Sequence, residues 1–158
     1  MQPDDNITIR LATRDDVPAI IALLADDLLG RTREDIDDPD TYLRAFDEMA
    51  AQGGNIALVA ERHGQGTKDI IGCLQLTMIP GLSRRGVKRA QIEGVRVGAA
   101  CRGLGIGERL IRHAIDLARA EGCGLVQLTS DVSRPDAHRF YERLGFVASH
   151  AGFKLTLD

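Results

Sequence analysis

A run of glycines beside an arginine is the first feature of this sequence that could carry out chemistry. It reads Arg-Gly-Leu-Gly-Ile-Gly over residues 102–107, and an apolar stripe of helical spacing follows it. Gly103, Gly105 and Gly107 have no side chains, so their backbone can approach an anion closely. A helix that begins here adds free N–H groups and a positive dipole end, and Arg102 adds a full positive charge. Together these groups suit a pyrophosphate.

Other glycine loops also bind phosphates, and two of them fail to match. The dinucleotide fingerprint needs a last glycine where this chain has Glu108, and the loop lies too late in the chain for a doubly wound fold. The Walker loop ends in Lys followed by Ser or Thr, and neither follows Gly107. A tight glycine turn that holds no ligand stays open as the alternative at this point.

The segments around the loop indicate one mixed sheet. Alternating apolar and polar residues predict a first strand and then a meander of antiparallel strands. A short apolar run without alternation follows the glycine loop and its helix, as expected for a strand that is buried on both faces and parallel to its neighbour. The expected strands span Ile7–Leu11, Asn55–Glu61, Ile70–Ile79, Val87–Val97, Gly124–Thr129, Phe146–Ser149 and Phe153–Leu157.

Four apolar stripes of helical spacing predict the helices that flank this sheet. Thr13 is the expected cap of the first helix, and glycines follow all four, with Gly30 closing the first. The expected helices span Val17–Leu28, Asp40–Ala51, Ile106–Ala118 and Asp136–Leu144. The glycine loop therefore lies between a strand and a helix, where a phosphate-binding loop needs to be.

Size and composition fit one globular domain over residues 1–158. The 158 residues are 44% hydrophobic and 27% charged, which are ordinary values for such a domain. A net charge of −3 and only 4% aromatic residues argue against a nucleic-acid partner held by phosphate contacts or base stacking. No apolar run approaches the ~20 residues that span a bilayer, and the acidic N-terminus has no signal-peptide pattern. We expect a cytoplasmic protein without a membrane partner.

The cysteines give no sign of a disulfide framework or a metal site. Cys73, Cys101 and Cys123 are odd in number, far apart in sequence and not clustered with the histidines. Cys101 stands beside the glycine loop, but no histidine is fixed near it in sequence to activate a nucleophile. We expect reduced thiols, with Cys73 and Cys123 in the core.

Three segments, taken in order, carry a family resemblance. Residues 102–107 match a Q/R-x-x-G-x-G/A signature, Gln91–Val97 looks like a central strand, and Phe140–Phe146 looks like a C-terminal F-Y-x-x-x-G-F segment. In this order and spacing they resemble the GNAT superfamily of N-acetyltransferases. The resemblance implies a mixed, mostly antiparallel α/β (α+β) sheet of six to seven strands, with a splayed central parallel pair and about four flanking helices.

The resemblance also implies acetyl-CoA as the cosubstrate, with no metal. In the family, the splayed strand offers backbone groups to the pantetheine arm, and the glycine loop holds the pyrophosphate. Arg139, near the start of the last helix, could reach the 3′-phosphate or lie in solvent. The implied cofactor-binding residues are Val95, Arg96, Val97, Arg102, Gly103, Leu104, Gly105, Ile106, Gly107, Glu108, Asp136 and Arg139.

Two residues match positions where the family places its proton-transfer groups. Glu93 lies on the strand that leads to the splayed region, so the resemblance implies a general base that acts directly or through a water. Tyr141 lies in the F-Y segment, so the resemblance implies a general acid for the departing thiolate. A surface glutamate and a packing aromatic are the respective alternatives.

The acceptor is the least specified part of the reaction. The chain between the first two expected helices is acidic and could attract an amine, whereas Arg84, Arg85, Lys88 and Arg89 would suit an acceptor with a carboxylate or phosphate. We therefore expect only that the acceptor is the primary amine of a small molecule, either an amino compound or a peptide, and that it attacks the thioester directly. A non-catalytic acyl-CoA sensor on the same fold is the alternative, and many members of the family are homodimers.

Overall fold

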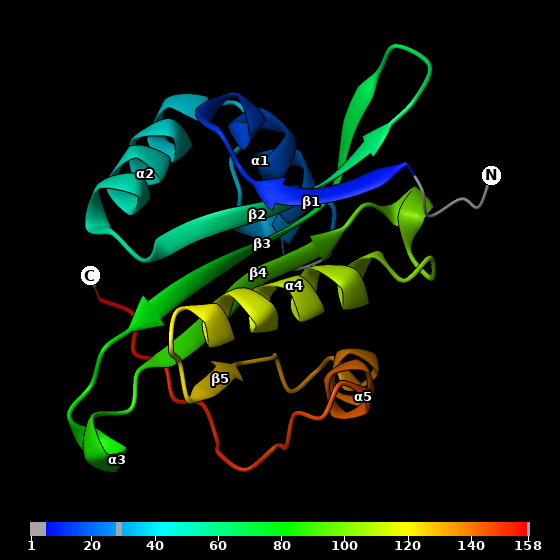
Figure 1. Cartoon of the computed structure of the whole chain (residues 1–158). Coiled ribbons are helices and arrows are strands. Elements are labelled where there is room, and N and C mark those ends of the chain that lie inside the picture. Colours follow the sequence, from blue (N-terminus) through cyan, green and yellow to red (C-terminus); the bar gives the residue numbers. More distant parts are fainter. Residues whose placement is uncertain (1–5, 28–29, 158) are drawn as a thin grey trace.

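Five strands form one sheet in the order β1-β2-β3-β4-β5 (Figure 1). The computed structural model describes residues 6–27 and 30–157. Neighbours from β1 to β4 run antiparallel, and β4 and β5 run parallel. The predicted mixed, mostly antiparallel sheet with one parallel pair is confirmed. The strands are β1 (Ile7–Leu11), β2 (Asn55–His63), β3 (Lys68–Ile79), β4 (Arg89–Val97) and β5 (Leu125–Leu128).

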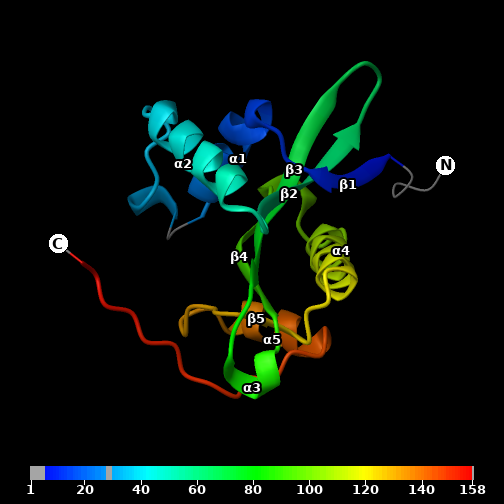
Figure 2. The same ribbon diagram turned by 60° about the vertical axis from the view of Figure 1, so that its left-hand side comes forward.

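The helices lie on both faces of this sheet. Seen from the side, α1 and α2 cover one face and α4 covers the other (Figure 2). Short 3₁₀ turns precede α1, α2 and the glycine loop. The α-helices are α1 (Val17–Ala25), α2 (Pro39–Gln52), α3 (Ser83–Gly86), α4 (Ile106–Ala120) and α5 (Pro135–Arg143), and the 3₁₀ turns are η1 (Arg14–Asp16), η2 (Gly30–Thr32) and η3 (Ala99–Cys101).

The main core lies between the sheet and α4. Its largest fully buried side chains come from both layers: Leu58, Leu74, Leu76, Ile92, Ile106, Leu110 and Ile111. A smaller cluster of Leu23, Val59 and Cys73 joins α1 to the other face. Because successive strand residues point to opposite faces, Leu74 and Leu76 face α4, whereas Cys73 faces α1.

Two expectations about the ends of elements are wrong. α1 ends at Ala25, and Gly30 lies in η2, where its backbone passes so close to α1 that a Cβ would collide with the Leu24 carbonyl; Leu28 lies outside the described residues. Residues 146–157 form no strand, so the described chain has five strands instead of six or seven. Phe153, Leu155 and Leu157 alternate along this segment but are at least 84% exposed, because no described strand lies beside them to pair with.

β4 separates from β5 beside a bulge at Gly94. Register places Cys73 opposite Arg96 but Gln75 opposite Glu93, so one β3 residue faces two residues of β4. Gly94 has a φ of 60°, which suits the extra residue of a bulge. The pairing of β4 with β5 ends at Ile92 and Leu128. Beyond that point, the edge of β4 that faces β5 has no strand partner in the described chain. This separation is what the family resemblance implies for its splayed parallel pair.

Candidate active site

The glycine loop turns the chain from β4 into α4. Gly103 and Gly105 have φ values of 79° and 77°, and a Cβ on either would meet nothing within 4 Å. Gly105 caps the helix in the left-handed conformation. A Cβ on Gly107 would instead meet Phe140 at 3.4 Å and Val97 at 3.7 Å. Gly103 and Gly105 therefore make the open turn, and Gly107 allows α4 to pack closely.

Arg102 stands at the start of this loop and is tied to the end of α1. Its guanidinium donates to the Val97 carbonyl at 3.2 Å and the Asp26 carbonyl at 3.4 Å, and lies 3.6 Å from Asp26 Oδ2. The same Asp26 carboxylate accepts from the Ala99 N–H at 3.3 Å. The Arg102 side chain is still 54% exposed, so its charge faces solvent beside the loop.

Glu93 begins the unpaired part of β4. Its side chain is exposed and makes no hydrogen bond or ion pair with the described residues. Ile92 before it and Val95 after it both pack into the α4 core. Glu93 therefore points to the opposite face, the one that α1 and α2 cover. A carboxylate with no internal partner can accept a proton from a ligand on that face.

Tyr141 lies on α5 among aromatic rings. Its ring meets Phe140 and Phe146 edge-on, with centroid distances of 5.1 Å and 5.9 Å. Burial raises the pKa of the Tyr141 hydroxyl, and the positive charges of Arg134 and Arg96 partly oppose that rise. The hydroxyl forms no hydrogen bond within residues 6–27 and 30–157. A tyrosine that serves only in packing usually donates its hydroxyl to a neighbouring group. The Tyr141 hydroxyl has no such partner in the described residues, so it is free to bond to a ligand.

Arg96 contributes a side chain as well as backbone. Nε lies 3.1 Å from Asp27 Oδ2, and Nη1 donates to the Val95 carbonyl at 2.9 Å. The contact with Asp27 is an ion pair outside hydrogen-bond geometry, because Nε is buried without a hydrogen-bond partner. Sequence reasoning assigned only the backbone of Arg96 to the site. The bulge determines which way this side chain points. Gly94 was the one feature of the sequence that could have indicated the bulge.

Three other expected cofactor residues lie in exposed ion pairs of their own helices. Glu108 pairs with Arg112 one turn along α4, at 2.7 Å. Asp136 and Arg139 pair with each other on α5. Asp136 is 93% exposed and Arg139 is 61% exposed. Their expected role at the cofactor stays a prediction.

Sequence reasoning missed a row of polar side chains across the sheet. Register aligns Asn55, Thr77, Gln91 and Gln127 on four neighbouring strands. Gln127 donates to Gln91 at 2.8 Å, and Thr77 donates to Asn55 at 3.2 Å. These residues alternate with Leu76 and Ile92 of the α4 core, so the row faces the same side as Glu93. The alternation within each strand was the signal that could have found it.

The acidic chain between α1 and α2 is largely used inside the fold. Asp27 pairs with Arg96 and accepts from the Gly30 N–H at 2.5 Å. Glu34 accepts from the Tyr42 hydroxyl at 2.8 Å, and Asp38 caps α2. The basic turn, with Arg84 and Arg85, lies at the start of β4, whereas the unpaired edge lies at its end.

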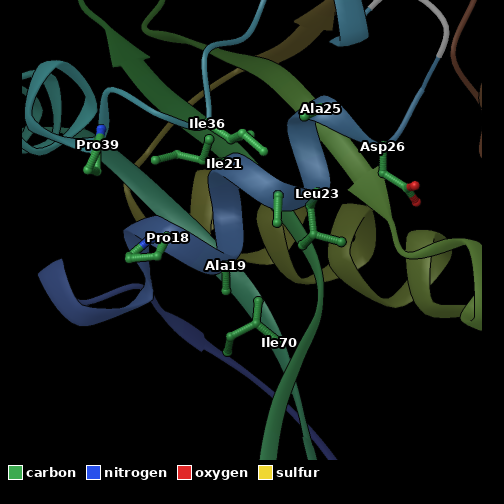
Figure 3. Close-up of a pocket in the computed structure, with 10 residues that line it drawn as sticks. Pro18, Ala19, Ile21, Leu23, Ala25, Asp26, Ile36, Pro39 and Ile70 are labelled. Carbon is green, nitrogen blue, oxygen red and sulfur yellow. The ribbon is translucent and has the colours of Figure 1, made fainter.

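A pocket of about 590 Å³ lies against α1 (Figure 3). Its lining is mostly apolar, including Ile21, Leu23, Ile36 and Ile70, and Asp26 is the charged residue at its edge. Neither Glu93 nor Tyr141 lines it. Because the lining is mostly apolar and includes neither of the two candidate proton-transfer residues, we do not assign the reaction to this pocket.

The described cysteines are free thiols. Cys73 and Cys101 are buried and Cys123 is half-buried. Burial raises the pKa of the Cys73 thiol to about 12, so this group stays protonated.

Among the described residues, no cluster of His, Cys, Asp and Glu could hold a metal ion. No described helix is long and apolar enough to cross a membrane.

A splayed parallel pair and a glycine loop at a helix start fit an acyltransferase of the mixed α/β class. The chain belongs to the acetyltransferase (GNAT) family, whose model matches residues 18–146. It is therefore an acyltransferase enzyme, in a family that uses acetyl-CoA as cosubstrate.

Comparison with known proteins supports this assignment. An uncharacterized N-acetyltransferase of Bacillus subtilis, YhdJ, is 34% identical over 118 residues, covering 74% of this chain and 77% of that protein. Glucosamine 6-phosphate N-acetyltransferase 1 of Oryza sativa is 33% identical over 109 residues, 68% of this chain and 63% of that protein, so the match spans less than two thirds of the rice enzyme. A solved structure described as a transcriptional regulator, from Bacillus halodurans C-125, is 48% identical with a TM-score of 0.89, covering 96% of this chain and 99% of that one.

Proposed function

We propose that this enzyme transfers the acetyl group of acetyl-CoA to the primary amine of a small molecule by direct attack. One observation carries the proposal. The unpaired edge of β4 after Ile92 runs from a carboxylate without an internal partner, Glu93, toward the glycine loop. Tyr141, whose hydroxyl has no hydrogen-bond partner in the described residues, packs against the same core cluster as Val95 and Val97 of that strand.

The backbone and two side chains fit the cosubstrate. The stretch from Val95 to Val97 has no strand partner on its β5 side, so its backbone can pair with the amides of a pantetheine arm. The Val95 and Val97 carbonyls already accept from Arg96 and Arg102, and each keeps a second lone pair for a ligand. The open turn at Gly103 and Gly105, with Arg102 beside it, suits a pyrophosphate. Ser130 Oγ, just past the end of β5, is buried without a hydrogen-bond partner in the described chain. A buried hydroxyl in that state needs a partner, which a bound ligand would supply.

The two free groups account for the proton transfers. Acetyl-CoA supplies a thioester whose carbonyl carbon accepts the amine lone pair. Glu93 takes the proton that the amine loses, directly or through a water. The carbon–sulfur bond breaks, and the Tyr141 hydroxyl gives its proton to the departing thiolate. The products are an amide and the free thiol of CoA, so one proton leaves the amine and one reaches the sulfur.

The acceptor we propose is a polar small molecule. The row formed by Asn55, Thr77, Gln91 and Gln127 offers amide and hydroxyl groups next to Glu93 on the face opposite α4. Such groups bind polar substituents of a ligand by hydrogen bonds and give an apolar ligand nothing to bury against. The rice relative is named for a polar amine, glucosamine 6-phosphate.

A thiol-release assay with acetyl-CoA and a panel of small amines tests this proposal. We expect acetyl-CoA to raise the melting temperature and at least one polar amine to release CoA. Glu93→Gln and Tyr141→Phe should each lower kcat while acetyl-CoA still binds. Tight binding of acetyl-CoA with no acceptor in any panel would favour the sensor alternative, for which the similarity to the Bacillus halodurans transcriptional regulator gives a reason. Absence of acetyl-CoA binding would contradict both.

Two matched glycines separate the cofactor role of the loop from its role in folding. Gly105 and Gly122 lie at opposite ends of α4 and have φ values of 77° and 76°, and a Cβ on either would meet nothing within 4 Å. Alanine at either position should cost about 1 kcal/mol of unfolding free energy. Only Gly105→Ala should raise the Kd for acetyl-CoA, because its methyl group points into the space that we assign to the pyrophosphate. Equal Kd values for the two variants would contradict that assignment.

We also propose that the protein is a cytoplasmic homodimer. Its three free cysteines suit a reducing compartment. The alternating apolar residues of the C-terminal segment, Phe153, Leu155 and Leu157, are exposed in the single chain. Side chains of this kind normally pack against a neighbouring strand, and a second copy of the chain can provide one.

A further inference from the structure

We infer that the acceptor is a polyhydroxylated primary amine, an amino sugar or an amino polyol. Its hydroxyl groups bond to the side-chain amides of Gln91 and Gln127, and Gln75 binds its amine together with Glu93. The inference rests on the proposed function, because it assigns the substrate class of the same site. It goes beyond a polar acceptor by naming the group that the site selects, the hydroxyl.

The register of the sheet places these four side chains on one face. Gln75 lies opposite Glu93, and Gln91 lies opposite Gln127. Ile92, between the two residues of β4, is buried in the core against α4. Because successive strand residues point to opposite faces, the three amides and the carboxylate point away from α4.

A ligand can reach this part of the face. α1 approaches β4 only beyond Glu93, where a Cβ on Gly94 would lie 3.7 Å from Leu24 and a Cβ on Gly98 would lie 3.6 Å from Leu23. Both α1 and α2 lie away from β5 (Figure 2). The three glutamines are half-buried and the glutamate is exposed. The four side chains are therefore open to solvent between the two helices and β5.

The pair formed by Gln91 and Gln127 has one free donor group and one free acceptor. Gln127 Nε2 donates to Gln91 Oε1 at 2.8 Å. Gln91 Nε2 and Gln127 Oε1 form no hydrogen bond within residues 6–27 and 30–157. Reversing both amides would exchange the roles and still leave one donor and one acceptor. A hydroxyl both donates and accepts, so it can bond to both amides, whereas an ammonium only donates and a carboxylate only accepts.

The Gln75 amide is oriented by its neighbours on β2. Its Nε2 donates to Asn55 Oδ1 at 2.9 Å, and Asn55 Nδ2 donates to Gln52 Oε1 at 2.7 Å. With its nitrogen held toward β2, the Gln75 amide has its oxygen on the side of β4, without a partner in the described chain. This oxygen and the Glu93 carboxylate are two acceptors on paired residues. An amine, which has several N–H donors, can bond to both.

The spacing of these groups fits one small molecule. Glu93 follows Gln91 by two residues of β4, which places them about 7 Å apart along the strand. Gln127 lies one strand further, about 5 Å from Gln91 across the sheet. A sugar ring or a short polyol chain spans these positions, with its amine at Glu93 and its hydroxyls over the two glutamines.

The charges around this surface favour a neutral body for the acceptor. Arg89, at the start of β4, faces the same side, but its guanidinium lies over the turn after β3, where a Cβ on Gly81 would be 3.2 Å from Nη1. Arg96, beyond the bulge, is paired with Asp27 at 3.1 Å. The surface between these two arginines is lined by amides and by Glu93. It therefore suits hydroxyl groups next to one amine.

The test compares matched acceptors. We would measure kcat and KM for glucosamine against trans-2-aminocyclohexanol, and for glucamine against 1-amino-2-hexanol. The second compound of each pair keeps the hydroxyl beside the amine and lacks the others. The wild type should give the higher kcat/KM with the polyhydroxylated member of at least one pair. Gln91→Met and Gln127→Met should each lower that preference about tenfold, because each removes hydrogen bonds to the ligand. Comparing one ratio across enzyme forms cancels the basicity of the amines.

Two further variants separate the amine end from the rest of the fold. Gln75→Met should raise KM for both members of a pair alike and leave their ratio unchanged, because both members carry the amine. Gln65→Met is the matched control: Gln65 is exposed in the turn between β2 and β3, and its side chain makes no hydrogen bond with the described residues. Its substitution should change neither KM nor the ratio. Urea unfolding checks each variant: lower stability of Gln91→Met and Gln127→Met with unchanged ratios would show that the pair is only structural.

The outcomes separate this inference from the proposed function. If both members of each pair are acetylated equally well, the inference is wrong and the proposed function stands. If no amine is acetylated, titration calorimetry decides. Glucamine that binds to the wild type, and about tenfold more weakly to Gln91→Met, supports the hydroxyl site without catalysis. Absence of turnover together with absence of glucamine and glucosamine binding overturns the inference.

Discussion

Glu93 and Tyr141 differ in how firmly the fold holds them. Tyr141 is held by Phe140 and Phe146, whereas Glu93 is exposed and has no partner among the described residues. A firmly held phenol has a fixed direction for proton transfer, and an exposed carboxylate gains its direction from the ligand. Substitution at Tyr141 should therefore report on chemistry more cleanly than substitution at Glu93.

Tyr141→Phe should lower kcat about 100-fold or more and change the Kd for acetyl-CoA little, because it removes only the oxygen of the general acid. Burial raises the pKa of Tyr141 above 10.0, so the wild-type phenol stays protonated through alkaline pH. Wild-type kcat should accordingly show no decline between about pH 8 and 9.5. Steady-state kinetics across that range measures both effects. A variant with full kcat would remove Tyr141 from the mechanism.

At the residue scale, the sequence indicated which residues form the candidate site better than it indicated where their side chains point. The glycine loop, Glu93 and Tyr141 were named from motif and spacing. The structure puts Glu93 at the start of the unpaired edge of β4 and the glycine loop after that strand, and it puts Tyr141 on α5. The ion pair between the Arg96 side chain and Asp27 was not predicted. It depends on a contact between residues far apart in the chain, which periodicity does not reveal.

At the scale of elements, the bulge in β4 decides what faces the ligand. Gly94 has a φ of 60°, and a Cβ there would find only Leu24 at 3.7 Å. Gly66, in the turn between β2 and β3, has a φ of 83° with nothing within 4 Å. Replacing either glycine therefore carries a similar conformational cost, but only one of them lies in the proposed site.

Gly94→Ala and Gly66→Ala should each lower the free energy of unfolding by about 1 kcal/mol, because alanine disfavours a positive φ. Only Gly94→Ala should lower kcat/KM, by about tenfold or more, since a shift of the bulge turns Glu93 and Arg96 relative to each other. Chemical denaturation and initial rates measure the two effects. Equal rates in both variants would show that the bulge has no part in positioning.

A buried ion network joins β1, β2 and the turn before α1. Arg10 donates to Asp16 at 2.7 Å and 2.9 Å and to Glu61 at 2.5 Å. This guanidinium holds the pKa of both carboxyls below their usual range. Since the unfolded chain then binds more protons at acid pH, the network stabilises the fold above about pH 4, and this contribution is lost as the pH falls further.

Asp16→Asn should lower the free energy of unfolding by about 2 kcal/mol at pH 7, because Arg10 loses a charged partner in a largely buried site. The variant should also lose less stability than the wild type when the pH falls from about 5 to 3. Asp116→Asn is the control, because Asp116 and Arg119 are both 73% exposed; its effect should stay below about 0.5 kcal/mol. Urea unfolding at several pH values distinguishes the two.

Most elements followed from local pattern, and the exceptions share a cause. The strand Ile7–Leu11 was predicted to the residue, and α4 and α5 nearly so, because alternation and apolar stripes are properties of the chain itself. The C-terminal segment carries the same alternation but forms no strand in the described chain. A strand is stable only beside a neighbouring strand. Alternation in the sequence predicts a strand, but it does not indicate which chain provides the neighbouring one.

At the scale of the whole molecule, two unpaired features offer sites for a second copy. β5 is a four-residue strand at the edge of the sheet, with β4 on one side and no described strand on the other. The C-terminal segment leaves the body on the side of the sheet where α2 lies (Figure 2). Exposed strand edges and exposed apolar alternation both promote pairing between chains.

Leu155→Glu should therefore convert a homodimer to a monomer, because a charge would replace the central apolar residue of the exposed alternation. Thr156→Glu is the matched control: it adds the same charge one residue along, where the side chain points the other way, and the dimer should persist. Sedimentation velocity at micromolar concentration measures both, and circular dichroism checks that the fold is retained. A wild-type chain that sediments as a monomer contradicts the dimer directly. Loss of the dimer in both variants would show that added charge, and not the apolar face of the segment, disrupts it.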